Sequence, residues 1–280
     1  MFQNTFKIAW RNLVKDLQFT LLNVLGLAAG LACFLLIYLW VHQQLGMDHF
    51  GGKGSQIYQV LEQRNSAGRI AISDESPGPL SETLAKERPE IKYAAAVAPP
   101  DWFQKFTLSV GDKDLKAAGQ YAGKDYFQIF PFKLLAGNKS QVLADKNDIV
   151  ISDQLAKRLF NTTQNLIGKP ILLQHHEVFV VSGVFQHPSD QSSQQFDFVL
   201  SFEYLKDIMG WVTSWNNTGP HHFLLLKKGT HIRAFNQEIA SVVAKYSGDT
   251  TRTAFAIPFA KNSLENTFVH GARTGGDWKM

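Results

Sequence analysis

A long, uninterrupted run of apolar residues lies near the start of the chain, from Thr20 to Val41. About 22 residues of helix at about 1.5 Å rise per residue measure about 33 Å, enough to cross a hydrocarbon core of about 30 Å. Asn23 is its only strongly polar side chain, whereas a core helix of a soluble protein would carry a polar stripe. A cleaved signal peptide would be shorter and would end at small residues, but bulky residues continue to Phe50. The run therefore predicts an uncleaved transmembrane helix over residues 19–42.

Charged and aromatic residues are distributed unevenly at the two ends of this run. Three basic residues precede it and only Asp16 opposes them, whereas segment 42–50 contains neither Lys nor Arg. The positive-inside rule therefore places the N-terminus in the cytoplasm and the chain after about residue 45 on the other side of the membrane. The residues predicted to lie at the two membrane interfaces are Lys7, Trp10, Arg11, Lys15, Tyr38 and Trp40.

Residues 1–18 have an apolar periodicity of their own, which predicts an amphipathic helix on the inner membrane surface. A plain positively charged flank is the alternative. Within the run, Gly26 and Gly30 form a G-x-x-x-G pair that would let a second helix pack closely, although glycine is also common in membrane spans without such a partner. The apolar face of the amphipathic helix would consist of Phe6, Trp10, Leu13, Val14 and Leu17.

The region after the run begins and ends with the same order of elements. Apolar patterning and the positions of proline predict a strand, a short helix and a second strand at each end, which is a β-α-β unit. Thr230 is the predicted cap of the second helix. The predicted elements are strand 56–62, helix 79–88 and strand 92–98, followed near the other end by strand 221–228, helix 232–246 and strand 253–259.

The segment between the two units is richer in strand. Phe106, Leu108 and Val110 alternate as in a half-buried strand, residues 148–160 predict a strand followed by a capped helix, and residues 169–186 predict a hairpin-like strand pair. These patterns predict an α+β domain in which a strand-rich subdomain is inserted between the two β-α-β units. The predicted limits are 50–134 for the first part, 135–200 for the insert, 201–270 for the second part and 271–280 for a tail.

Composition and charge add few constraints. The 280 residues include 28 Lys and Arg and 24 Asp and Glu, a net charge of +4 that lies partly before the apolar run, so nucleic-acid binding is not indicated. Cys33, the only cysteine, lies inside the run, which excludes an intramolecular disulfide. About 230 residues follow the run, enough for a core of their own in one or two domains.

The sequence lacks the common motifs of catalysis. It contains neither the G-x-x-x-x-G-K-[ST] phosphate loop nor the G-x-S-x-G elbow. The histidine doublets at 175–176 and 221–222 would each point to opposite faces of a strand, and Asp145 with Asp148 does not follow the calcium-loop pattern. We therefore expect no enzymatic activity, no cofactor and no metal.

Several stretches give the chain a resemblance to a known family over almost its full length. Together they resemble the MacB-like (FtsX-type) permeases of ABC transporters. The family has a Tyr-Asp-x-Phe-His-like segment after its first span, from which this chain departs at Met47 and Gly51. The stretches are "AWRNLVKD", "TLLNVLGLAAGLACFLLIYLWV", "IYQV", "DYFQIFPFKLLAGN", "LADKNDIVISDQLAKRLF", "LIGKPILL", "VSGVF", "FDFVLSF", "WNNTG" and "FLLLKKGT".

The resemblance implies a periplasmic domain with a porter-like subdomain of paired β-α-β units and an inserted sabre-like subdomain, in agreement with the element order above. It implies a cell inner membrane location and three kinds of partner: a cytoplasmic ABC ATPase subunit, a second permease copy in a homodimer or pair, and a periplasmic adaptor. The implied function is that of a permease component that couples ATP hydrolysis by the separate subunit to export or mechanotransmission.

Members of this family carry further spans after the periplasmic core, whereas this sequence ends at "GARTGGDWKM" before a second hydrophobic run. We expect a truncated product or a fragment that does not transport by itself. Two hypotheses from other classes stay open at this point. The first is a single-pass, membrane-anchored periplasmic binding or adaptor domain, and the second is an anchored hydrolase that uses scattered histidines and aspartates such as His175 or His221.

Overall fold

The computed structural model divides the chain into two units, Met1–Gly46 and Met47–Met280. The residues that the structure describes are 11, 15, 17–45, 54, 56–66, 69–188, 192, 195–259, 267–269 and 272–275.

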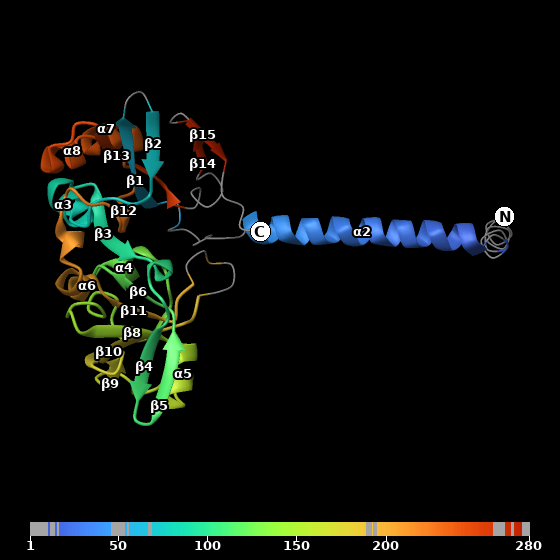
Figure 1. Ribbon diagram of the computed structural model, residues 1–280, viewed down its shortest axis with the longest axis horizontal. Helices are drawn as coiled ribbons and strands as arrows, with labels where there is room; N and C mark the ends of the chain where they lie inside the picture. Colours follow the sequence, from blue (N-terminus) through green and yellow to red (C-terminus); the bar gives the residue numbers. More distant parts are fainter. Residues whose placement is uncertain are drawn as a thin grey trace. The chain divides into compact units, whose positions relative to one another are not determined.

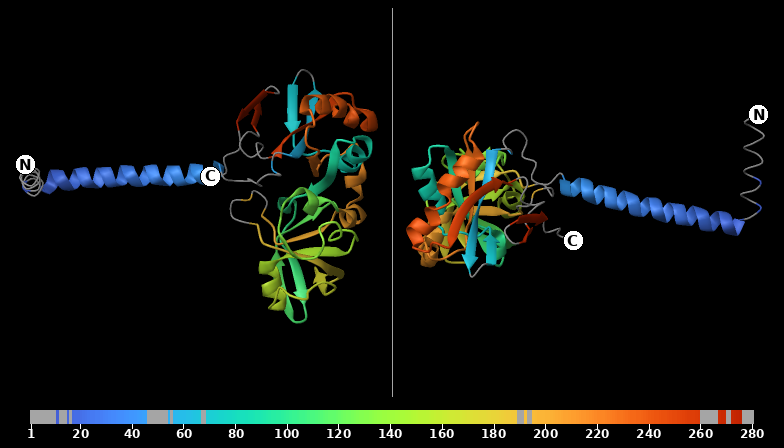
Figure 2. Two further views of the ribbon diagram at one scale, coloured as in Figure 1. Left: turned by 180° about the vertical axis from the view of Figure 1, so that it is seen from behind. Right: turned by 90° about the horizontal axis from the view of Figure 1, so that it is seen from above.

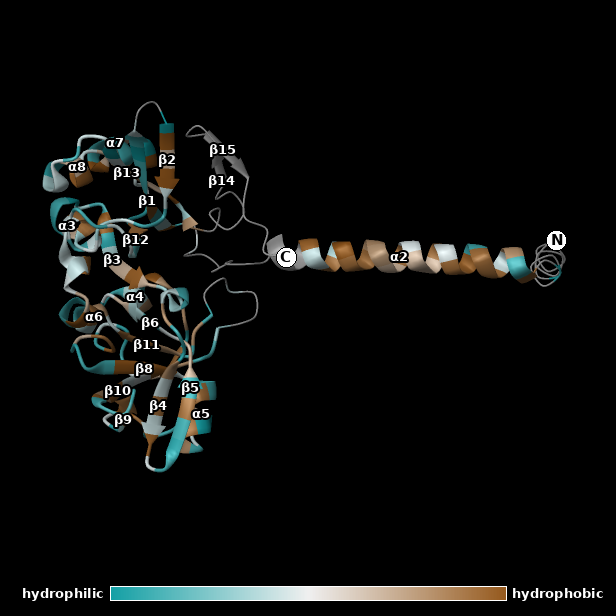
Figure 3. Ribbon diagram, in the orientation of Figure 1, coloured by the Kyte–Doolittle hydropathy of each residue, from teal (hydrophilic) through white to brown (hydrophobic). Residues whose placement is uncertain are grey.

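The first unit contains one long helix, α2 (Leu17–Leu45). Its segment Leu17–Val41 is long and apolar enough to cross a membrane, and none of its most apolar window is buried within the structure. Figure 3 shows apolar residues along most of this helix and on all visible sides. A helix that is apolar all round and covered by nothing matches the predicted span at 19–42.

The second unit is built on one 13-stranded sheet, and a separate two-stranded sheet follows it (Figure 1). The strands are β1 (Ile57–Ser66), β2 (Arg69–Ser73), β3 (Ile91–Ala98), β4 (Phe106–Val110), β5 (Lys113–Ala117), β6 (Gly119–Ala122), β7 (Leu134–Ala136), β8 (Asp148–Ser152), β9 (Pro170–Leu173), β10 (Glu177–Phe185), β11 (Phe198–Ser201), β12 (His221–Leu226), β13 (Arg252–Pro258), β14 (Thr267–Val269) and β15 (Ala272–Gly275). The helices are α3 (Leu80–Glu87), η2 (Pro100–Trp102), α4 (Tyr126–Ile129), α5 (Asp153–Phe160), α6 (Phe202–Ile208), η3 (Gly210–Thr213), α7 (Ile232–Ile239) and α8 (Val242–Ser247).

The two predicted β-α-β units are present, but their strands alternate in space. The order at this end of the sheet is β13-β1-β12-β3, with every neighbouring pair antiparallel. β1 and β3 are thus parallel with β12 between them, and β12 and β13 are parallel with β1 between them. The interleaving makes the two units a single four-stranded layer, and the predicted α+β class is confirmed.

Three helices cover one face of this four-stranded layer. Leu84 of α3, Phe235 of α7 and Val243 of α8 pack with Val60 and Leu224 in one buried cluster. Each helix is short and presents a single apolar stripe, which fits one-sided packing on a sheet.

The insert extends the same sheet from β6 to β5. β6 joins it to β3 through two residue pairs, Val97 with Ala122 and Ala98 with Tyr121. The predicted strand and capped helix at 148–160 are β8 and α5, where the Ser152 hydroxyl accepts a hydrogen bond from the Leu155 amide at 3.1 Å. The predicted strand pair at 169–186 is the antiparallel pair β9 and β10.

The predicted second helix at 232–246 is wrong in two details. Two shorter helices, α7 and α8, replace it, with Ala240 and Ser241 between them. The break lets the Ala240 carbonyl accept a hydrogen bond from the Ala254 amide at 3.1 Å instead of continuing one helix. His231 rather than Thr230 is the residue before α7, because the Thr230 hydroxyl donates to the Lys227 carbonyl at 2.8 Å.

Strand pairing also bears on the predicted limits of the insert. β4 is hydrogen-bonded to β9, so β4 and β5 lie beside strands of segment 135–200 rather than beside β1 and β3. A division that follows the hydrogen bonds would place residues 99–220 in the insert, between the end of β3 and the start of β12. The limits 50–134, 135–200 and 201–270 stay predictions, since the whole domain forms one compact unit.

The outer edge of β13 is closed by the helices that precede it. The Asn236 side chain accepts a hydrogen bond from the Ala256 amide at 2.8 Å and donates one to the Ala256 carbonyl at 3.1 Å. The Ala254 amide donates to the Ala240 carbonyl, and the Arg252 amide donates to the Asp249 carbonyl at 3.2 Å. Three outward amides of this terminal strand, on Arg252, Ala254 and Ala256, and the Ala256 carbonyl therefore have partners within the domain.

Candidate functional site

The predicted interface residues lie along α2 as far as the structure describes them. Tyr38 and Trp40, near its C-terminal end, are 56% and 40% exposed. Arg11 and Lys15 are exposed helical residues, whereas Lys7 and Trp10 lie outside the described residues, as does most of the predicted amphipathic helix. The interface assignments stay predictions.

The G-x-x-x-G face of α2 is open. A methyl group added at Gly26 or Gly30 would meet no atom within 4 Å outside the helix's own backbone. Because the most apolar window of α2 is uncovered throughout, this opening does not distinguish the two glycines, and their packing role stays a prediction.

Ser109, His175 and Asp114 are the residues that most resemble a hydrolytic triad. The Ser109 hydroxyl lies 3.4 Å from His175 Nδ1, and an Asp114 carboxylate oxygen lies 4.0 Å from the same Nδ1. In a working triad the serine hydroxyl and the carboxylate contact different ring nitrogens of the histidine. One nitrogen accepts the serine proton, and the carboxylate accepts a hydrogen bond from the N–H of the other. The arrangement at His175 therefore does not support the hydrolase hypothesis.

The other histidine doublet is divided between solvent and core. His221 lies 3.5 Å from an Asp74 carboxylate oxygen, while His222 is fully buried on the opposite face of β12. Burial lowers the pKa of His222 to about 3. Within the part of the chain that the structure describes, no three histidine, cysteine or carboxylate side chains gather as metal ligands would.

The buried imidazole makes stability depend on pH. In the unfolded chain His222 takes up a proton near its ordinary pKa of 6.5, but in the folded protein it does so only near 3. The free energy of unfolding therefore falls as the pH drops below about 6.5, because protonation favours the unfolded chain. At pH 5 the loss amounts to about 2 kcal/mol. We expect His222→Leu to flatten the fall in stability between pH 7 and 5, measured by denaturant unfolding, whereas exposed His176→Gln should leave it unchanged.

A cluster of aromatic side chains joins the two parts of the domain. We call it the aromatic cluster: Tyr126, Phe127, Phe130, Phe132, Phe185, Phe196, Phe223 and Phe259. Phe130 is fully buried, and its ring centroid lies 5.0 Å from Tyr126, 5.1 Å from Phe223 and 5.4 Å from Phe259. Edge-to-face and tilted rings at these separations add to the hydrophobic contribution of burial.

The members of the aromatic cluster come from both parts of the domain. α4 and the residues after it lie in the centre, Phe185 and Phe196 come from the insert, and Phe223 belongs to the four-stranded layer. Ile57, the first residue of β1, and Phe259, directly after β13, are buried in the same apolar core. The place where the chain enters the domain from α2 and the place where β13 ends are thus held by side chains that also reach the insert.

A polar contact on the other side of the sheet reinforces this junction. Lys206 of α6 lies 2.5 Å from Glu82 of α3 and 2.8 Å from Glu203. Burial alone would lower the pKa of Lys206, but hydrogen bonds to Glu203 and Glu82 outweigh it and raise the pKa. Close by, Gly78 passes so near η3 that an added Cβ would lie 2.0 Å from the Val212 carbonyl oxygen, which explains the absence of a side chain there.

A buried ion pair holds β13 to β1. Arg252 donates from Nε and Nη2 to the two carboxylate oxygens of Glu62 at 2.6 and 2.7 Å, and from Nη1 to the Trp215 carbonyl at 2.9 Å. Arg252 is 1% exposed and Glu62 is 4% exposed. The Trp215 ring stacks on Tyr246 with centroids 4.6 Å apart, so the pair also fixes α8. The sequence pattern did not predict this pair, because Glu62 stands beside other polar residues of β1 such as Gln59 and Gln63.

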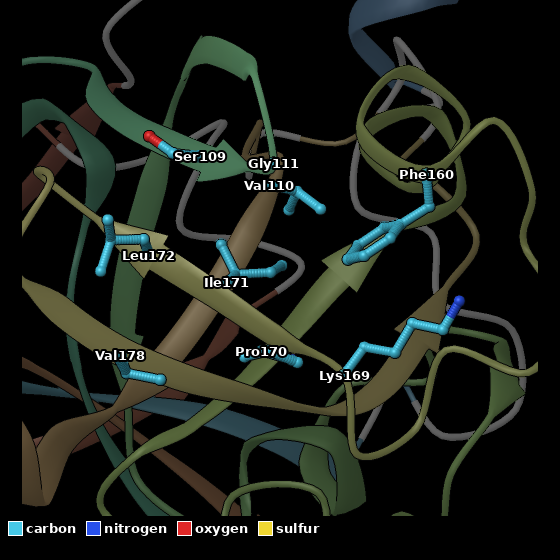
Figure 4. A pocket seen from close by; sticks show the side chains of 9 residues that line it. All are labelled: Ser109, Val110, Gly111, Phe160, Lys169, Pro170, Ile171, Leu172 and Val178. Atoms are coloured by element: carbon cyan, nitrogen blue, oxygen red, sulfur yellow. The ribbon is translucent and has the colours of Figure 1, made fainter.

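The insert carries an apolar hollow of about 410 Å³ at the ends of β4 and β9 (Figure 4). Phe160, Val110 and Ile171 line it, and Lys169 is the one charged residue in its lining, with Nζ 5.5 Å from the Phe160 ring centroid. Most of the described residues that line this hollow are apolar, so it offers a surface for apolar contact.

Three solved structures have a similar fold. A domain described as that of a permease from Porphyromonas gingivalis is similar with a TM-score of 0.62 and 17% identity, covering 74% of this chain and 92% of that one. The periplasmic region of MacB from Actinobacillus actinomycetemcomitans gives 0.51 and 15%, covering 73% and 90%. The extracellular domain of the noncanonic ABC-type transporter YknZ from Gram-positive bacteria gives 0.51 and 15%, covering 71% and 99%.

At these identities the similarity establishes the fold alone. No curated protein matches the chain. The family described as the MacB-like periplasmic core domain, however, matches residues 20–242, which is most of the sequence and includes the apolar part of α2. The chain therefore belongs to the MacB-like periplasmic core domain family.

Proposed function

We propose that the chain is a permease component of an ABC transporter. In this proposal α2 anchors it in the inner membrane, and the domain from Ile57 to Phe259 lies in the periplasm. A separate cytoplasmic subunit hydrolyses ATP, and the motion that results moves the periplasmic domain for export or mechanotransmission. The chain itself supplies no catalysis.

The observation that carries this proposal is the aromatic cluster. Ile57 and Phe259, at the entry and exit of the domain, share one buried core with Phe196 of the insert. Protein interiors of this density transmit displacement because they have little free volume in which to absorb it. A force applied at the start of β1 would therefore move both parts of the domain together rather than bend one against the other.

The proposed partners are a cytoplasmic ABC ATPase subunit, a second permease copy and a periplasmic adaptor. Family membership supports the first. The G-x-x-x-G spacing of Gly26 and Gly30 would let another helix approach α2 closely in the membrane. A transporter of this kind needs two states that differ in their contacts, because ATP binding can shift only an equilibrium between such states.

The proposed topology makes a labelling prediction. In a Cys33→Ser background, a membrane-impermeant maleimide should label Lys116→Cys on β5 in intact spheroplasts, because that side chain is exposed on the periplasmic domain. Asn4→Cys should react only after the membrane is permeabilised. Labelling of both positions without permeabilisation, or of Asn4→Cys alone, would contradict the proposed orientation.

The coupling itself is tested with a spin label at Lys116→Cys. The full chain is purified with the ATPase subunit that accompanies it and is reconstituted into proteoliposomes. We expect the distance distribution between labels on paired copies to shift between the nucleotide-free state and the state trapped with ATP and vanadate. If no ATPase accompanies the chain, or if the distribution does not change, the anchored binding or adaptor domain replaces this proposal.

A further inference from the structure

A rigid basic turn follows β12 and borders the beginning of β1. The Thr230 amide donates to the Lys227 carbonyl at 3.3 Å, and Gly229 between them has φ +82°. A positive φ at the third residue is typical of a type II turn, and glycine adopts this conformation without steric strain. The Thr230 hydroxyl donates to the same carbonyl, so two hydrogen bonds fix the turn that presents Lys227 and Lys228.

This turn encloses a polar hollow of about 380 Å³. Lys227 and Lys228 line one side, and Gln56 and Tyr58, at the start of β1, line the other. Both lysine side chains are exposed, and among the described residues no carboxylate oxygen lies within 4.0 Å of either ammonium group. Within the described part of the chain, the hollow thus combines two positive charges without a carboxylate partner with the Gln56 amide and the Tyr58 hydroxyl, all of which can donate hydrogen bonds to an anion.

The position of the hollow along the chain is as informative as its charge. Gln56 directly precedes β1, and only ten residues, 46–55, separate it from the end of α2 at Leu45. Fully extended, such a linker reaches at most about 40 Å. The end of β13 lies beside the same place, since Tyr58 is paired with Pro258. Figure 2 shows the sheet and helices of the second unit from two further sides.

We propose that the Lys227–Lys228 turn binds the phosphate groups of anionic phospholipids at the membrane surface from which α2 emerges. Basic residues near a membrane gain attraction to anionic headgroups, and the gain disappears beyond a Debye length, so contact requires the turn to reach the surface. Occupation of the hollow would hold the domain against the membrane and set the position from which it moves. The inference rests on anchoring by α2 but not on coupling to an ATPase.

The test uses the full chain in lipid nanodiscs, with its retention in the discs measured first so that failed anchoring is recognised separately. Discs of phosphatidylcholine are compared with discs that contain about a third phosphatidylglycerol. The readout is the rate at which a water-soluble amine reagent modifies each lysine, determined by mass spectrometry. Lys116 on β5 is the internal control, because β5 and β12 are far apart in the strand order.

We expect modification of Lys227 and Lys228 to be at least about three-fold slower in the anionic discs, and this protection to vanish at about 0.5 M salt. Lys116 should react at the same rate in both. Equal rates for Lys227 and Lys228 in the two kinds of disc would overturn the proposal. Equal protection by inorganic phosphate in neutral discs would also overturn it, since the hollow would then be a site for a soluble anion.

A second measurement uses variants matched in charge. Lys227→Gln/Lys228→Gln should carry at least about two-fold less phosphatidylglycerol through detergent purification than the unaltered chain. Lys105→Gln/Lys116→Gln, which removes two charges from the insert, should carry the same amount as the unaltered chain. Equal lipid content in both variants would count against the turn as the binding site.

Discussion

Replacing Arg252 with methionine is expected to lower the free energy of unfolding by about 3–5 kcal/mol. The substitution keeps most of the side-chain volume but leaves the Glu62 carboxylate buried without its bidentate partner. It also removes the donor to the Trp215 carbonyl. Denaturant unfolding of the full chain in detergent, followed by tryptophan fluorescence, measures the loss, because Trp215 lies at the site.

Two further variants make this expectation specific. Arg64 lies 3.9 Å from the same carboxylate but is 48% exposed, so Arg64→Met should change stability by no more than about 1 kcal/mol. Glu62→Leu combined with Arg252→Met should recover much of the loss, because an apolar pair needs no compensation for a buried charge. Equal losses for Arg64→Met and Arg252→Met would show that the buried pair is not what holds β13 to β1.

Truncating Phe130 to alanine is expected to cost about 3–5 kcal/mol, since it opens a cavity at the centre of the aromatic cluster. Phe130 is fully buried and contacts rings from the four-stranded layer and from the residues around α4. Phe130→Leu, which keeps more of the volume, should lose clearly less. The same unfolding experiment provides the measurement.

The exposed apolar residue Ile208 supplies the matched control. It is 50% exposed, so Ile208→Ala should stay within about 0.5 kcal/mol of the unaltered chain. If Phe130→Ala were tolerated as well as Ile208→Ala, the cluster would be loosely packed and could not carry motion from α2 to the insert. In that event the mechanical part of the proposed function would lose its support.

Local patterns predicted the elements of this chain well. The apolar run gave α2, alternation gave β4, and the Ser152 cap with its following apolar stripe gave α5. These features depend on residues close in sequence, whose periodicity and capping chemistry are visible without the fold. The resemblance to MacB-like permeases was carried by such stretches and is confirmed by the family match.

Features that depend on distant residues were not predictable in the same way. Arg252 and Glu62 are 190 positions apart, and no local pattern links them. The pairing of β4 with β9, which moves β4 and β5 beside the insert, likewise depends on register between remote strands. The aromatic cluster arises because α4 lies between the two parts of the domain, and the many phenylalanines in the sequence do not reveal that their rings meet.

The hydrogen bonds at the outer edge of β13 affect how copies of the chain can associate in a membrane. Anchored copies meet at high local concentration and in similar orientations, which favours joining exposed sheet edges into larger assemblies. The Asn236 amide occupies the backbone groups of Ala256 that such a neighbour would need. Asn236 of α7 thus hinders strand pairing between copies at this edge of the sheet, so copies would associate through other surfaces.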